Sequence, residues 1–100
     1  MSAIEEVAAE RARQRLEEGW TSEHDDSHDD GVLARAAACY ALNATGIVAD
    51  VFWPFARRWW KPKSPRRDLI RAAALLVAEI ERMDRATANL TEELTRMNHE

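Results

Sequence analysis

The chain has 100 residues, of which 46% are apolar, which suits one small hydrophobic core and is too little for two. Its formal net charge is −4, and no apolar stretch approaches the roughly 20 residues needed to cross a bilayer, so a membrane-spanning protein is excluded. The lone Cys39 has no disulfide partner within the chain, and residues 1–18 carry too many charges for a secretory signal. We therefore expect one domain, 1–100, in the cytoplasm.

Charge is distributed unevenly along the chain. Residues 1–31 hold ten acidic and three basic side chains, residues 32–71 two acidic and eight basic, and residues 72–100 six acidic and three basic. The middle third is therefore a basic island within an acidic protein.

A capping box opens the first predicted helix, because Ser2 is followed three residues later by Glu5. Five apolar residues then recur at helical spacing: Ile4, Val7, Ala8, Ala12 and Leu16. Gly19 supplies a stop, so we predict a helix over residues 3–18 with Trp20 folded back over its end.

The segment "GWTSEHDDSHDDG", residues 19–31, is predicted to be an acidic elbow between two helices. His24 and His28 are four residues apart and could share a transition metal with Asp25 or Asp26. Such residues in a loop also cap helices and pair with arginines. We favour the structural role and predict no bound metal and no cofactor.

A second helix is predicted over residues 32–45, with Asp29 or Asp30 as its cap and Gly46 at its end. Its apolar stripe is rich in alanine, which implies close packing against a neighbour: Leu33, Ala36, Ala37, Tyr40, Ala41 and Ala44. Residues 47–64 contain two prolines and three tryptophans, so we expect an irregular connection or one short helical turn there.

Ser64 followed by Pro65 predicts the start of a long helix over residues 65–97. Apolar and small residues repeat at alternating steps of four and three: Leu69, Ala73, Leu76, Ile80, Met83, Thr87, Leu90, Leu94 and Met97. The first part of this stripe, to Met83, could pack in the core, but a helix of about 50 Å outreaches the other two. The predicted fold class is an all-α, small three-helix bundle with a long C-terminal helix, dimeric through this stripe.

The basic island suggests a site for an anionic, nucleotide-like ligand, because flat rings stack on bases and guanidinium groups hold phosphates. The predicted stacking residues are Trp20, Trp53, Trp59 and Trp60, and the predicted phosphate contacts are Arg57, Arg58, Arg66 and Arg67. Equally, the aromatic residues could cover the core while the arginines pair with the acidic elbow. Duplex nucleic acid is not expected, because the protein is acidic overall and has no helix-turn-helix pattern.

Carboxylates on two helices offer an enzymatic alternative, in which Glu6, Glu10, Glu81 and Asp84 bind Mg²⁺. The pattern resembles the metal site of MazG-like all-α nucleoside triphosphate pyrophosphohydrolases, which is EExxE followed by ExxD. Here "EEVAAE" has one extra residue, and "ERMD" follows some seventy residues later. We therefore lean towards a protein without enzymatic activity.

Three blocks cover most of the chain: "AAERARQRLEEGWTSEHDDSHDDGVLARAAACYA", "WPFARRWWKP" and "RRDLIRAAALLVAEIERMDRA". Their order and spacing resemble a family of small proteins of tailed phages and prophages. "RLEEGWTSEHDD" and "IERMDRATA" more weakly resemble the ryanodine-receptor repeat domain, from which no residue role is carried over.

The phage resemblance implies an accessory protein of the host cytoplasm that acts against host defence. The leading prediction is that it sequesters a nucleotide-like ligand. The alternative is an inhibitor of a host defence complex that mimics nucleic acid with Asp25, Asp26, Asp29 and Asp30.

Overall fold

The computed structural model describes residues 1–99, in which helices and two short 3₁₀ turns are the regular structure and no strand occurs. The elements in chain order are α1 (Ala3–Glu17), α2 (Ser22–Asp26), α3 (Val32–Ala44), η1 (Asp50–Phe52), η2 (Arg57–Trp59) and α4 (Pro65–Asn98). The predicted all-α fold with a long C-terminal helix is confirmed. The elbow differs from the prediction in containing a helix of its own, α2.

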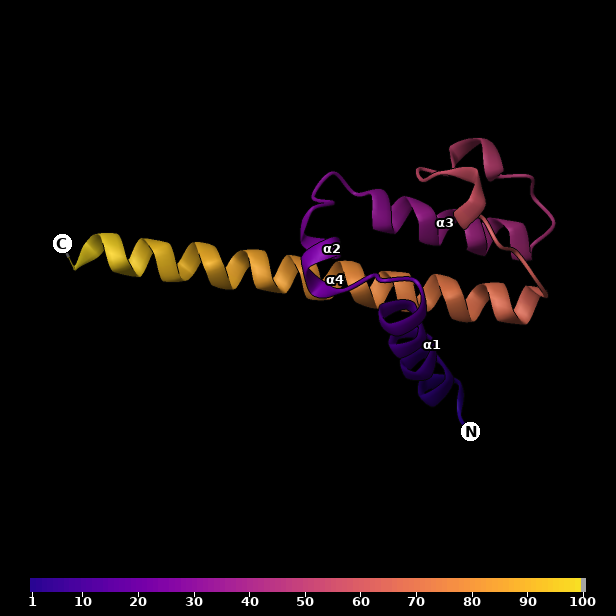
Figure 1. The fold of residues 1–100 in the computed structure, drawn as a ribbon, viewed down its shortest axis with the longest axis horizontal. Coiled ribbons are helices and arrows are strands. Elements are labelled where there is room, and N and C mark those ends of the chain that lie inside the picture. The colour runs from indigo at the N-terminus through magenta and orange to yellow at the C-terminus, as the bar shows by residue number, and fades with distance from the viewer. Residues whose placement is uncertain (100) are drawn as a thin grey trace.

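Helix α4 forms the spine of the molecule (Figure 1). Helix α3 runs alongside the first half of α4, α1 crosses that half, and the second half projects beyond the rest of the chain. The molecule measures 55 × 33 × 22 Å, and its long dimension is about the length of the 34-residue α4. In the described part of the chain, no helix combines the length and apolarity that a bilayer crossing requires.

Local sequence explains where the helices begin. Ser2 and Glu5 form the predicted capping box, and Ser64 Oγ accepts a hydrogen bond from the backbone N–H of Arg67 at 3.2 Å. The predicted cap of α3 by Asp29 or Asp30 is wrong, since Gly31 holds the N-cap position with φ +82° and no side chain caps this end. The chain enters α3 through a left-handed turn, which glycine adopts without strain.

The core lies between α3 and α4. Leu33, Ala36 and Ala37 of α3 are buried against Leu75 and Ala78 of α4. Small alanine side chains let the two helix backbones approach closely, as the predicted stripe on α3 implies. Further aromatic residues complete this cluster, namely Trp20, Tyr40 and Trp53.

Two apolar stripes do not face this core. On α1, Ile4 and Leu16 are 83% and 85% exposed, whereas the polar residues Glu10, Arg11 and Gln14 are buried. On α4, the large apolar members of the predicted stripe are all exposed: Leu69, Leu76, Ile80, Met83, Leu90, Leu94 and Met97. The expectation that its first part could pack in the core is therefore wrong, because the other side of α4 faces α3.

Candidate functional site

A buried ion pair fixes the acidic elbow to α1. The Arg11 guanidinium donates to Asp25 and, through Nη1, to the backbone oxygen of Trp20 at 3.1 Å. Both partners are withdrawn from solvent, Arg11 with 4% of its surface exposed and Asp25 with none. Asp25, a predicted partner contact, is therefore an interior residue that positions α2.

The two elbow histidines belong to an aromatic cluster. His24 stacks on Trp20 with ring centroids 5.9 Å apart, and His28 meets His24 edge-on at 4.7 Å. His28 also contacts Phe55 at 5.3 Å, so the elbow lies against the connection between α3 and α4. This packing gives both imidazoles a structural contact.

The aromatic residues of the connection form a lid over the core. Trp53 contacts Tyr40 and Trp60, with ring centroids 5.4 and 4.9 Å apart, and its Nε1 donates to the backbone oxygen of Ala56 at 3.1 Å. The Tyr40 hydroxyl accepts from the backbone N–H of Lys61 at 3.1 Å, and burial raises the pKa of this hydroxyl. The lid therefore ties the connection to α3.

The four predicted stacking residues differ in their availability. Trp20 and Trp53 are buried, whereas Trp59 and Trp60 are half-buried at the edge of the lid. Arg58 and Lys61 lie over the Trp59 ring, 5.4 and 5.2 Å from its centroid. Trp59 thus combines an accessible edge with two cations, and the four rings do not surround a common pocket among those found in the described residues.

Three of the four predicted phosphate contacts already hold carboxylates: Arg57 with Asp50, Arg66 with Glu6, and Arg67 with Glu10. The hydrogen bond from Arg66 lowers the pKa of Glu6, and the one from Arg57 lowers the pKa of Asp50. A phosphate would have to displace these carboxylates. Arg58 has no ion-pair partner within residues 1–99.

The predicted magnesium ligands are likewise paired, apart from one. Glu10 is buried, which raises its pKa, but the hydrogen bonds and charge of Arg13, the charge of Arg67 and a hydrogen bond from Gln14 together outweigh burial and leave the pKa lowered. Glu81 lies 3.5 Å from Arg15 Nη2, and Asp84 is exposed. In the described chain, no group of three or more histidine, cysteine or acidic side chains is placed to hold a metal ion.

The elbow presents carboxylates to solvent. Asp29 and Asp30 are exposed, as is Glu23, and none of the three has an ion-pair partner within residues 1–99. Asp26 is bound by Arg85 at 2.8 Å and, with Asp29, lines a cleft of about 200 Å³ whose other walls are Arg82, Ala86 and Asn89. We call Glu23, Asp26, Asp29 and Asp30 the acidic surface.

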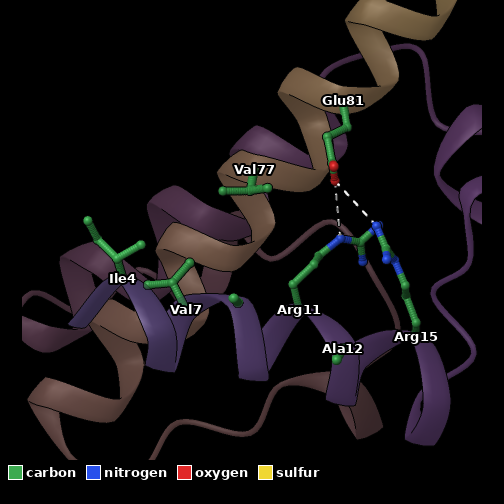
Figure 2. Close-up of a pocket in the computed structure, with 8 residues that line it drawn as sticks. Ile4, Val7, Arg11, Ala12, Arg15, Val77 and Glu81 are labelled. Atoms are coloured by element: carbon green, nitrogen blue, oxygen red, sulfur yellow. Dashed lines mark hydrogen bonds and ion pairs between the residues drawn. The ribbon is translucent and has the colours of Figure 1, made fainter. Parts of the chain in front are cut away.

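A second hollow lies between α1 and α4 and was not predicted. This groove, of about 330 Å³, is lined by Ile4, Val7, Ala8, Ala12 and Val77, with Arg11, Arg15 and Glu81 at one end. Figure 2 shows both arginines converging on Glu81 while the apolar side chains lie along the open part. One sequence signal could have predicted this groove. Helix α1 carries a polar stripe, Glu10, Arg11 and Gln14, and burial of this stripe turns the apolar stripe of the helix outward.

Comparison with known proteins yields no relative, since no family model, no curated protein and no solved structure matches the chain. The resemblance to small phage proteins therefore stays a prediction.

Proposed function

We propose that this protein acts by binding a positively charged protein surface through its acidic surface, as a phage-type inhibitor of a host complex in the host cytoplasm. The supporting observation is the distribution of ion pairs. Arg57, Arg66 and Arg67 are occupied by carboxylates of their own chain, whereas Asp29 and Asp30 have no such partner in the described residues. The charge available to a partner near the elbow is therefore negative.

The architecture suits this role because the acidic surface stands on a fixed support. The buried Arg11–Asp25 pair anchors α2, and Arg85 holds Asp26 from the side of α4. Carboxylates held in place in the free protein lose little conformational freedom on binding. Clustered negative charge also accelerates encounter with a basic groove that normally accepts phosphates. The proposed contact residues are therefore Glu23, Asp26, Asp29 and Asp30. Compared with the sequence prediction, this set includes Glu23 and omits Asp25, because Asp25 is buried.

Capture of a nucleotide-like ligand is the second candidate, and the observation that favours it is the setting of Trp59. A base stacked on this ring would lie close to Arg58 and Lys61. Lys61 also contacts Glu18 at 3.4 Å, so Arg58 is the cation that a phosphate engages without displacing a carboxylate. This candidate predicts that Arg58→Ala weakens binding more than Arg66→Ala does.

Native mass spectrometry of protein purified from its host distinguishes the two candidates. We expect a bound basic protein that is lost when Asp29→Asn and Asp30→Asn are combined, and that dissociates as the salt concentration rises. Glu5→Gln with Glu17→Gln is the matched control, because it removes the same charge from exposed positions on α1 outside the acidic surface, and glutamine at position 5 can keep the capping box. Equal retention by both double variants would contradict the proposal. A bound nucleotide lost on Arg58→Ala would establish the second candidate instead.

A further inference from the structure

The C-terminal third of α4 is exposed to solvent. Every residue from 87 to 98, here called the tail, is exposed, and Leu90, Leu94 and Met97 are 57%, 51% and 62% exposed. Twelve residues of helix without packing are marginally stable in water, because helices in proteins depend on the burial of an apolar face. An apolar face that nothing in its own chain covers is therefore what a helix shows when a partner covers it.

The first half of α4 carries a matching apolar surface. Leu76 and Ile80 continue the stripe of the tail onto the body of the molecule, and the next residue after Leu76, Val77, forms a wall of the groove. Of the sixteen large apolar residues that are exposed, nine lie on the α4 stripe or in the groove. The stripe and the groove thus form one continuous apolar surface.

The stripe is complementary to itself when two copies run in opposite directions. With residue 85 at the centre, Leu76 lies opposite Leu94 of the second copy, Ile80 opposite Leu90, and Met83 opposite Thr87. The overlap runs from residue 73 to residue 97, which is about 36 Å of helix. Every large apolar residue of the stripe within this overlap then has a partner.

The groove decides between antiparallel and parallel pairing. A helix that enters a groove between two other helices must be uncovered on both flanks, and the tail meets this condition. In a parallel pair the first halves of α4 would face each other, where Ala72 and Glu79 are already buried by their own chain. The tail also has small side chains beside its apolar stripe, Ala88 and Thr91, which permit a close approach to α1.

We propose that two copies of this chain form an antiparallel dimer in which the tail of each lies on the α4 stripe and in the α1–α4 groove of the other. The sequence predicted association through the stripe, whereas its direction and the part played by α1 come from the structure. A standard interface takes about 800 Å² from each partner, which is roughly an eighth of the 6452 Å² surface of this chain. The dimer does not rest on the proposed function, although Asp26 and Asp29 of the acidic surface lie beside the middle of the overlap, where they share a cleft with Arg82, Ala86 and Asn89.

Sedimentation equilibrium with three variants tests the interface. Leu94→Glu in the tail and Ala8→Glu in the groove should each weaken self-association at least tenfold, because each places a carboxylate in the contact. Val51→Glu is the control, since Val51 is 72% exposed and lies in η1, away from the contact. Circular dichroism checks that each variant keeps its helices. A parent protein that is monomeric at high micromolar concentration would overturn the proposal, and the groove would then serve a partner of another sequence.

Distance measurement between spin labels tests the direction. A single label at Asn98→Cys, in a Cys39→Ala background, lies thirteen residues from the centre of the overlap. The two labels of an antiparallel dimer should therefore be about 40 Å apart, whereas those of a parallel dimer should be within about 15 Å. The short distance would overturn the antiparallel arrangement. Unchanged association of Ala8→Glu would overturn occupation of the groove by the tail.

Discussion

The Arg11–Asp25 pair provides the sharpest test of how this fold is stabilised. Asp25→Ala removes the carboxylate and leaves the Arg11 guanidinium buried beside Trp20, where Arg11 Nε already lacks a hydrogen-bond partner in the described structure. The nearest remaining carboxylate is that of Glu81, which lies 3.8 Å from Arg11 Nε and is 43% exposed, so it compensates the buried charge only in part. The guanidinium cannot reach water without opening the contact between α1 and α2. The variant should therefore be strongly destabilised.

The expected loss is set by burial. Removing one member of a buried ion pair costs about 3–5 kcal/mol, and Asp25 is fully buried. A domain of this size has about 5–15 kcal/mol of total stability, so the variant would lose a large share of it. At roughly 5 °C for each kcal/mol, the melting temperature should fall by about 15–25 °C. The variant Arg11→Met with Asp25→Leu should recover most of this loss, because it leaves no unpaired charge.

Urea unfolding followed by circular dichroism measures these differences at one fixed protein concentration. The control is the neighbouring substitution Asp26→Ala, which breaks a half-exposed pair with Arg85 and should cost less than about 1 kcal/mol. Equal losses for Asp25→Ala and Asp26→Ala would refute the reasoning, since each variant breaks an arginine pair and only the pair of Asp25 is buried. A double variant no more stable than Asp25→Ala would also refute it, because the cost would then not come from the stranded charge.

Three further outcomes are expected. The pKa values of Glu6, Glu10 and Asp50 are lowered in the folded protein. The stability that these carboxylates contribute to the fold is therefore complete above about pH 4.3 and is lost as the pH falls through the lowered pKa values. A urea midpoint that rises on acidification would contradict this. Cys39 is 1% exposed and burial raises its pKa, so its thiol should react with a disulfide reagent slowly in the native protein and at once in urea; immediate native reaction would be inconsistent with this burial. Gly31→Ala should cost about 1–2 kcal/mol in urea unfolding, because alanine at φ +82° is strained; unchanged stability would show that the turn adjusts.

Local patterns predicted most of the secondary structure. The Ser2–Glu5 capping box and the Ser64–Pro65 start are signals read over a few residues, and the helices begin where these signals place them. The alanine-rich stripe of α3 also identified its buried face, because the buried residues of that helix include no charged side chain. The cap at Gly31 was missed, since the left-handed turn that precedes α3 depends on how the elbow is held against the rest of the chain.

Periodicity could not tell which face of α1 or α4 is covered. Helix α1 carries an apolar stripe and a polar one, and burying the polar stripe is favourable only where every charge meets a partner. Those partners are distant in sequence: Asp25 is 14 residues from Arg11, and Arg67 is 57 residues from Glu10. Long-range pairing also engages Arg66 of the basic island, whose partner Glu6 is 60 residues away. The sequence by itself therefore determined the helices, whereas only the tertiary structure decided which charges are neutralised and which apolar surfaces stay open to a partner.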